Sequence, residues 1–336
     1  MTGRTYLDWN ATAPLRPEAR AAMVAACEVA GNPSSVHAEG RAAKMLVERA
    51  REEVAAAVGC RAAEVVFTAG ATEAAGVLAG LSAVEVEVTA HDCLQAHATG
   101  QGGLLALGMA NSETGVLSDM PQRAGVLLDV VQAVGRVPFA FGWSGADFAI
   151  LSAHKLGGPK GVGALIVRDG VEIASLRKGG GQEKGRRSGT ENVMGIAGFG
   201  AAISAALHDL DAGVWDRVRD LRDRFEARIA DGAPDTVVAG ADRPRLSNTS
   251  CIVSPGWKGE TQVMQMDLAG FAISAGSACS SGKVRASRVL RAMGFDDQAA
   301  GSAIRMSLGA ETTEEDVMRF ADVWLAHHAR FRARAA

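Results

Sequence analysis

Apolar residues recur at helical spacing near the start of the chain and form short continuous runs further along it. Residues 41–59, RAAKMLVERAREEVAAAVG, repeat apolar positions three and four apart and end at a glycine, which predicts an amphipathic helix. EVVFTAG (64–70) predicts a buried strand, and ATEAAGVLAG after it predicts a helix. Later apolar runs predict strands at 84–90, 104–110, 125–130, 147–153 and 163–169. Strands that alternate with helices or compact loops imply a mostly parallel sheet covered on both faces, hence an α/β protein.

The pattern changes after Gly189. Two long helical stretches, 191–209 and 213–231, precede the segment GAPDTVVAG, which predicts a boundary. The remaining third mixes short strands with helices, as in a smaller α+β domain. We therefore expect a large domain at 16–234 and a small domain formed by 1–15 with 235–336. The predicted elements of the small domain are TSCIVSP, a helix near 259–269, a helix near 287–293, IRMSLG and a final amphipathic helix.

Composition narrows the class of protein. A length of 336 residues is enough for about two domains, and 48% hydrophobic with 22% charged residues is ordinary for a globular chain. The net charge of −3 provides no global basic footprint, so we expect no direct nucleic-acid or membrane partner. No apolar run reaches the roughly 18 residues of a membrane span, and the polar start does not resemble a signal peptide. These features predict a cytoplasmic protein.

The five cysteines also carry information. They are scattered and none forms C-x-x-C, so neither a zinc ribbon nor a disulfide framework is expected, and we predict no metal site. Cys27 and Cys251 lie in segments that predict buried positions, whereas Cys279 lies among small polar residues in SAGSACSSGK. Such a Gly/Ser-rich segment predicts a mobile loop, and Lys283 and Arg285 nearby would favour a reactive thiolate.

The sharpest local pattern is ILSAHKLGGPKGVGALIV. A predicted strand ends at Ser152, and His154 and Lys155 follow before a glycine-rich turn into another strand. Ligands collect at the carboxyl ends of strands in α/β sheets, and a lysine there suits Schiff-base chemistry. Ser152 and His154 could bind a phosphate. A surface lysine in a glycine turn is the alternative interpretation.

Two further strand ends carry polar residues. In LLDVVQAVG, Asp129 ends an apolar run and Gln132 follows three residues later. An aspartate there can pair with a cationic ring nitrogen, although a helix N-cap is the alternative. In TAGATEAAG, Thr72 opens a predicted helix whose backbone N–H groups could bind an anion. The glycine-rich segment GGGQEKGRRSGTEN contains Thr190 and is either a phosphate-binding loop or a surface loop.

Nine segments follow one another along nearly the whole chain: YLDWNATAPLRPE, GNPSSVHAEGRAA, FTAGATEA, NSETGV, LLDVVQAVG, SAHKLGGPKGVGAL, GGGQEKGRRSGTENV, SAGSACSSGKVRASRVLRAMG and IRMSLGAETTEEDV. Taken in order, they resemble those of the pyridoxal-phosphate-dependent cysteine desulfurases, which have the class V aminotransferase fold. The resemblance implies a PLP-dependent transferase of fold type I, with a mostly parallel large domain and a smaller α+β domain. The GSACSS form is similar to the group whose catalytic cysteine lies on a longer mobile loop.

The resemblance implies a role for each matching residue. Cys279 would be the sulfur-accepting nucleophile, and Lys155 would bind pyridoxal 5′-phosphate covalently and shuttle a proton. The substrate carboxylate would be held by Asn111 and Arg305. The other cofactor contacts would be Asp129 at the pyridine nitrogen, Gln132 at the ring oxygen, Asn111 at the cofactor, His91 stacked on the ring, Thr72, Ser152 and His154 at the phosphate, and Thr190 at the phosphate of the partner subunit in a homodimer.

The chain also departs from the family pattern. The stretch between His91 and Asn111 is shorter than in the family, as if a helix and a strand were missing, and His97 is the alternative to His91. Ala74 and Ala75 replace asparagines, and VRASRV has alanine and arginine where the family has proline and histidine. None of these changes removes a reacting group.

The function implied is conversion of L-cysteine to L-alanine, with the sulfur taken as a persulfide on Cys279. The persulfide would pass to an acceptor protein for iron–sulfur cluster assembly, such as a scaffold, or for tRNA thiolation. Two alternatives stay open: a selenocysteine lyase or other lyase on the same fold, and a non-catalytic relative that acts as a binding partner. The sequence alone does not identify the acceptor.

Overall fold

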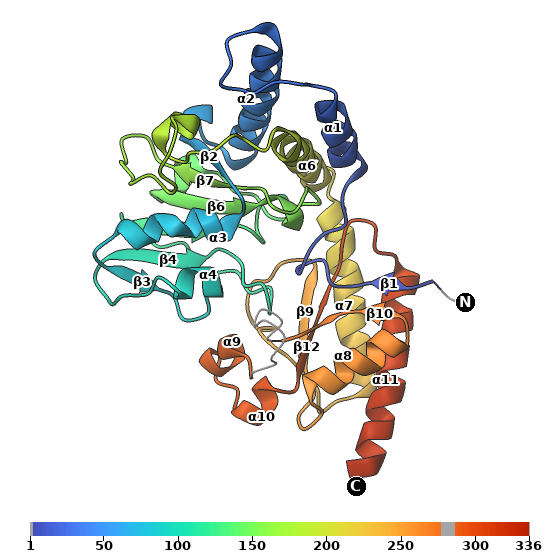
Figure 1. Ribbon diagram of the computed structural model, residues 1–336. Helices are drawn as coiled ribbons and strands as arrows, with labels where there is room; N and C mark the ends of the chain where they lie inside the picture. Colours follow the sequence, from blue (N-terminus) through green and yellow to red (C-terminus); the bar gives the residue numbers. More distant parts are fainter. Residues whose placement is uncertain (1–2, 277–285, 336) are drawn as a thin grey trace. The chain divides into compact units, whose positions relative to one another are not determined.

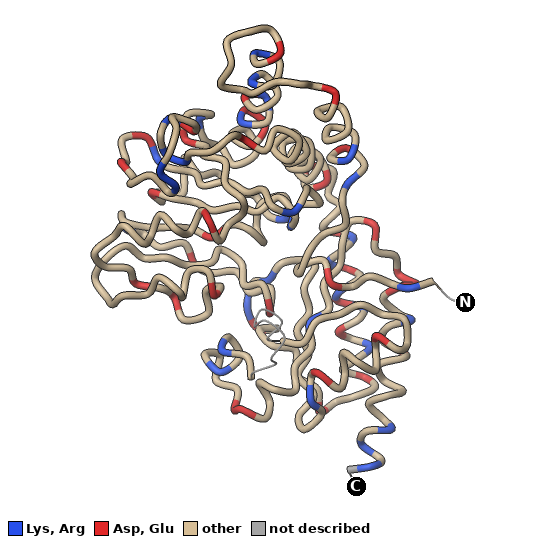
Figure 2. The backbone as a smooth tube through the Cα atoms, in the orientation of Figure 1, with Lys and Arg blue, Asp and Glu red and all other residues tan. Residues whose placement is uncertain are grey.

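The computed structural model describes residues 3–276 and 286–335 of the 336-residue chain (Figure 1). The chain folds into two compact units. The large unit comprises Ala13–Ala110 and Ser118–Ala212, and the small unit comprises Met1–Thr12, Asn111–Leu117 and Gly213–Ala336. Acidic and basic residues are interspersed along the backbone of both units (Figure 2).

The large unit is built on a six-stranded sheet with the order β2-β7-β6-β5-β4-β3. Strands β3 to β6 pair in parallel, whereas β7 is antiparallel to both β6 and β2. The prediction of a mostly parallel sheet in an α/β fold is therefore confirmed. The strands are β2 (Val65–Thr68), β3 (Val84–Val86), β4 (Leu104–Gly108), β5 (Val126–Asp129), β6 (Phe148–Ser152) and β7 (Gly163–Val167).

Neighbouring residues of β2 show that both faces of this sheet are covered. Successive side chains of a strand point to opposite faces. Val66 packs with Leu78 in the core beneath α3 (Ala71–Ala74) and the following 3-10 turn η2 (Ala75–Gly80). Phe67 instead meets the ring of Phe199 edge-on, at a centroid separation of 6.4 Å, on the opposite face. Phe199 lies in α6 (Val193–Asp211), which also packs against α1 (Pro17–Cys27) and α2 (Ala38–Val58).

Helix α6 corrects the expectation that no apolar segment reaches the length of a membrane span. It is long and apolar enough to cross a membrane, and it is the one such helix among the residues described. Half of its most apolar stretch is buried inside the large unit, on α1 and α2. A core helix has the same composition as a membrane span, so packing within this unit accounts for its apolar residues.

The small unit contains a four-stranded antiparallel sheet with the order β11-β12-β9-β8, and a two-stranded parallel pair of β1 with β10. Helix α7 (Val214–Gly232) belongs to this unit, because its Phe225 ring stacks on Phe320 of α11 (Glu314–Ala335). The division thus falls before α7, whereas we expected the boundary after residue 234. The other elements are β1 (Thr5–Tyr6), β8 (Val237–Val238), β9 (Thr249–Val253), α8 (Gly259–Leu268), β10 (Phe271–Ala272), β11 (Ser274–Ala275), α9 (Arg288–Ala292), α10 (Asp297–Ala300) and β12 (Ala303–Ser307).

A buried ion pair fixes one loop of the large unit to the start of β2. Arg51 of α2 makes a bidentate pair with Glu183, at 2.7 and 2.8 Å, and both side chains are more than nine-tenths buried. The N–H of Phe67 donates to the same Glu183 carboxylate at 2.9 Å, and the Arg51 guanidinium lies over the Phe67 ring. Glu183 and Lys184 hold positive φ angles of 48° and 55°, which non-glycine residues rarely adopt. The pair therefore stabilises a strained turn.

We expect Glu183→Ala to lower the free energy of unfolding by about 3–5 kcal/mol, because it leaves a buried guanidinium without its partner. Glu48→Ala is the matched control, since Glu48 pairs with the same arginine at 3.2 Å but is half exposed. It should cost less than about 1 kcal/mol. Urea denaturation measures both. Equal losses of unfolding free energy in the two variants would show that the buried Arg51–Glu183 pair stabilises the fold no more than the half-exposed Arg51–Glu48 pair does.

Candidate active site

Two strand ends of the large unit lie side by side. Asp129 is the last residue of β5, and it is in register with Ile150 of the neighbouring parallel strand β6. Strand β6 ends at Ser152, and a single 3-10 turn then presents His154 and Lys155. The carboxyl ends of parallel neighbours meet at one edge of the sheet, where α/β proteins bind ligands.

Several groups act on the Asp129 carboxylate at this edge. Burial raises the pKa of Asp129 above its usual value, and the electrostatic interactions with His91 and Lys155 act in the opposite direction. The N–H of Val131 also donates to the carboxylate at 3.0 Å. Three residues predicted from separate segments, Asp129, His91 and Lys155, are thus brought within electrostatic reach of one another.

His91 is held by the helix that follows it. It is the N-cap of α4 (Asp92–Gln95), and its Nδ1 accepts the N–H of Cys93 at 3.1 Å. Of the two histidines left open by the sequence, His91 is the one that interacts electrostatically with Asp129. His97 lies beyond the helix, where its backbone N–H donates to Leu94.

The predicted phosphate ligands gather where β6, β7 and the start of α3 meet. Gly70, which precedes α3, has a φ of 156°, and a Cβ on Gly163 of β7 would lie 2.6 Å from the Gly70 Cα. Only glycines allow this approach. The Ser152 hydroxyl lies 3.9 Å from the position that a Cβ on Gly70 would take, and Thr72 is the second residue of α3. The turn therefore places backbone N–H groups and two hydroxyl residues close together, a combination that suits an anion.

His154 adds a neutral ring to this group. Burial, together with the charges of Lys155 and Lys160, lowers its pKa to about 4. A histidine with this pKa is uncharged at neutral pH, so it offers one N–H donor and one acceptor nitrogen. It can bind a phosphate oxygen by a hydrogen bond.

The sequence did not single out Arg136, although this residue joins two predicted ones. The buried Arg136 guanidinium donates to the Gln132 amide oxygen and, at 3.1 Å, to the backbone carbonyl of Lys155. Gln132 is also buried. Arg136 thus links the segment after β5 to the segment after β6. The spacing of four residues between Gln132 and Arg136 was the available signal, but it does not reveal the contact with Lys155.

The residues expected to hold a substrate carboxylate lie in the small unit. Arg305 of β12 is only 2% exposed; it pairs with Asp8 at 2.7 Å and donates to the Ser112 carbonyl at 3.0 Å. Its Nε has no hydrogen-bond partner among the described residues. Asn111 is next to Ser112, and its side-chain oxygen accepts the N–H groups of Glu113 and Thr114. Arg305 and Asn111 are therefore neighbours, and the buried guanidinium retains a donor for an anion.

Two predicted residues remain. The Thr190 side chain is exposed in the large unit, in a loop that Arg187 ties to Glu73 of α3 at 3.1 Å. Cys279 lies outside the described residues, as do Lys283 and Arg285.

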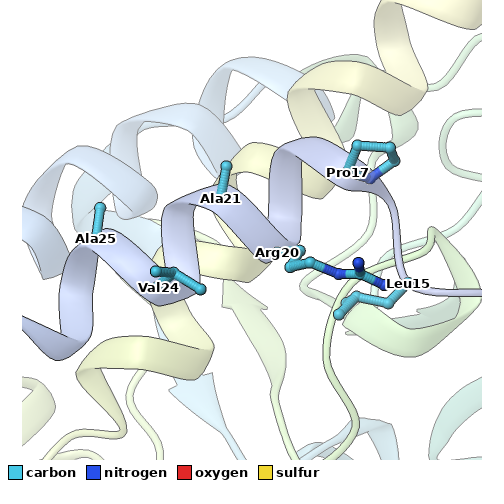
Figure 3. Close-up of a pocket in the computed structure, with 6 residues that line it drawn as sticks. All are labelled: Leu15, Pro17, Arg20, Ala21, Val24 and Ala25. Atoms are coloured by element: carbon cyan, nitrogen blue, oxygen red, sulfur yellow. The ribbon is translucent and has the colours of Figure 1, made fainter.

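A surface hollow of about 520 Å³ on α1 contains none of the predicted site residues, as Figure 3 shows. Its lining consists of Leu15, Pro17, Arg20, Ala21, Val24 and Ala25.

Comparison with known proteins decides the family. The sequence profile of the aminotransferase class-V family matches residues 5–93 and 81–320. A cysteine desulfurase of Cereibacter sphaeroides is 39% identical over 369 aligned positions, which cover 95% of this chain and 94% of the relative. The chain belongs to the aminotransferase class-V family, in its cysteine desulfurase group. The cysteine desulfurase IscS of Dictyoglomus turgidum is 34% identical, covering 96% and 94% of the two chains.

The solved structures agree with this assignment and with fold type I. A NifS-like protein from Rickettsia africae superposes with a TM-score of 0.89 at 28% identity, covering 97% of this chain and 99% of the other. The relatives are named cysteine desulfurases, which supports that activity over a selenocysteine lyase.

The comparisons also bear on the shortened segment. The alignment with the Cereibacter sphaeroides enzyme spans 369 positions, more than the 336 residues of this chain, so that relative contains segments that this chain lacks. The family profile matches in two pieces that overlap at 81–93, beside the stretch predicted to be short. In the structure, only the four-residue helix α4 lies between β3 and β4.

Proposed function

We propose that this protein uses pyridoxal 5′-phosphate to take sulfur from L-cysteine and to deliver it, through Cys279, to an acceptor protein. The observation that supports this proposal most directly is the convergence of His91 and Lys155 on the half-buried Asp129 carboxylate at the ends of β5 and β6. In the balanced reaction, the bond between Cβ and sulfur breaks and the sulfur forms an S–S bond with Cys279. A proton then returns to Cβ, so that L-alanine leaves and a persulfide remains on the enzyme.

The residues at this edge fit the cofactor. A half-buried carboxylate with a raised pKa is stabilised by a positive N–H group, and a protonated pyridine supplies one. Lys155 supplies the amine that the aldehyde requires, while Ser152, Thr72 and the neutral His154 suit the phosphate. Gln132 would hold the ring oxygen, and His91 would lie on the ring. When bound, pyridoxal phosphate withdraws electrons from the substrate Cα, which makes the Cα proton acidic.

The protein residues then have distinct tasks. Lys155 removes the Cα proton and returns a proton later in the reaction. Arg305 and Asn111 hold the substrate carboxylate, a task that suits the buried Arg305, whose Nε has no partner within residues 3–276 and 286–335. Asp129 keeps the pyridine nitrogen protonated, and Cys279 receives the sulfur.

We further propose that the enzyme is a homodimer in which Thr190 contacts the phosphate of the partner subunit. The exposure of Thr190 on its own protomer supports this role. The acceptor would be a protein of iron–sulfur cluster assembly or of tRNA thiolation. Retention of every reacting residue argues against a non-catalytic relative.

The test of this function combines an assay with one substitution. The purified protein should be yellow, and it should release alanine and, with a thiol reductant, sulfide in equal amounts from L-cysteine. Asp129→Asn should reduce turnover by at least about 10²-fold and weaken cofactor binding, because the ring nitrogen loses its counter-charge. Asp147→Asn is the matched control: Asp147 lies just before β6, at the opposite end of that strand, and accepts the Gly125 N–H at 3.0 Å. Wild-type turnover in Asp129→Asn would contradict this role and would show that Asp129 serves only to accept the backbone N–H of Val131.

A further inference from the structure

The loop that carries Thr190 is closed on itself by hydrogen bonds. The N–H of Leu176 donates to the Arg186 carbonyl at 2.8 Å, and the N–H of Ser188 donates to the Arg177 carbonyl at 3.0 Å. The Ser188 hydroxyl also donates to the Gly180 carbonyl. The segment from 176 to 190 is therefore a defined structure within the large unit.

One side chain links the anchored part of this loop to its far end. The amide oxygen of Gln182 accepts the N–H of Gly189 at 3.1 Å. Gly189 immediately precedes Thr190, and Gln182 immediately precedes Glu183, which the bidentate pair with Arg51 fixes to α2. A continuous set of contacts thus runs from the buried ion pair to the residue before Thr190.

Gly180 leaves the space that the Gln182 amide occupies. A Cβ on Gly180 would lie 2.7 Å from the Gln182 Oε1 and 3.2 Å from its Nε2, which is too close. A Cβ on the next residue, Gly181, would meet nothing within 4 Å, and Gly181 has an ordinary φ of −89°. The two glycines therefore differ in one respect that matters here: only the first must stay small for the Gln182 amide to reach Gly189.

We propose that Gln182 is a positioning residue for Thr190: it sets the place of Thr190 through Gly189, from an anchor formed by Arg51 and Glu183. The inference rests on the proposed role of Thr190 at the cofactor phosphate. Loss of this single neutral hydrogen bond leaves the exposed Gly189 N–H to water and releases the end of the loop from Gln182. We expect this loss to weaken cofactor binding about tenfold, with little effect on the fold.

The experiment measures the affinity of the full-length protein for pyridoxal 5′-phosphate by absorbance titration, together with its thermal midpoint. Gln182→Met keeps the side-chain length but removes the acceptor, and Gly180→Ala displaces the amide without changing it. Both should weaken binding about tenfold. Gly181→Ala is the matched control and should stay within about twofold. The double variant Gly180→Ala/Gln182→Met should be no weaker than either single variant, because both act on one contact.

The outcomes separate the inference from the role on which it rests. Thr190→Val should weaken binding, since it removes the hydroxyl that contacts the phosphate. If it does so while Gln182→Met binds like wild type, the positioning role is wrong and the role of Thr190 stands. If Thr190→Val binds like wild type, the role of Thr190 fails and the inference fails with it. Additive losses in the double variant, or a loss in Gly181→Ala equal to that in Gly180→Ala, would also overturn the inference.

Discussion

Lys155→Ala should abolish the covalent link to the cofactor and reduce turnover by about 10²–10⁴-fold or more. The amine is required twice, first to bind the aldehyde and then to move the Cα proton, and a methyl group can do neither. Lys155 is the lysine whose charge acts on Asp129, at the edge where the predicted cofactor residues converge. Borohydride treatment followed by mass spectrometry should find the cofactor attached to the wild-type peptide that contains Lys155, and to no peptide of the variant.

Lys160→Ala is the matched control for this prediction. Lys160 lies five residues further along, is exposed, and its charge acts on the same His154 ring. Its replacement should leave both the covalent link and the turnover largely intact. Borohydride fixation that persists in Lys155→Ala, or that is lost in Lys160→Ala instead, would show that Lys155 is not the lysine that binds the cofactor.

Much of the large unit follows directly from the sequence. The helix predicted at 41–59 is α2, Ala38–Val58, and Gly59 ends it with a left-handed φ of 62°. The apolar runs that predicted the later strands contain β4 to β7, because strands buried on both faces consist almost wholly of apolar residues. The local sequence pattern is sufficient to predict a helix or strand where the same few residues determine both which side chains are buried and where the element ends.

Other features depend on contacts that a local pattern does not contain. The alternation in VEVEVTA predicted a strand over 84–90, but β3 ends at Val86. The Glu87 carboxylate accepts both the N–H and the hydroxyl of Thr89, which forms a turn instead. The extent of the small unit is a second case. Helix α7 is visibly amphipathic, but only the stacking of Phe225 on Phe320 shows which unit receives its apolar face.

The candidate site shows the same division. Each segment identified a residue type suited to cofactor chemistry, whereas the resemblance to a family supplied the role of each residue. The convergence of His91 and Lys155 on Asp129 depends on β5 and β6 being parallel neighbours. The contacts of Arg136 with Lys155 and of Gln182 with Gly189 were not predicted, since each depends on how the chain returns after a loop.

Cys279→Ala should separate the two halves of the reaction. The cofactor and Lys155 act on the substrate Cα, whereas sulfur transfer requires a thiolate. The variant should therefore bind cofactor as wild type does and still change colour on addition of L-cysteine. It should nevertheless release alanine at least about 10³-fold more slowly, because the substrate sulfur has no acceptor.

The four other cysteines are the controls, and their surroundings explain why they should not replace Cys279. Burial raises the pKa of both Cys60 and Cys251 to about 12, so that both stay protonated at neutral pH. Cys93 is buried as well, which leaves Cys27 as the one exposed thiol among the described residues. Cys27→Ser is consequently the most demanding control, and it should retain turnover. After brief exposure to L-cysteine, mass spectrometry should find one additional sulfur on the peptide that contains Cys279. Because a lyase without an enzyme thiol would leave no such mark, an additional sulfur on Cys27, or full turnover in Cys279→Ala, would contradict sulfur transfer through Cys279.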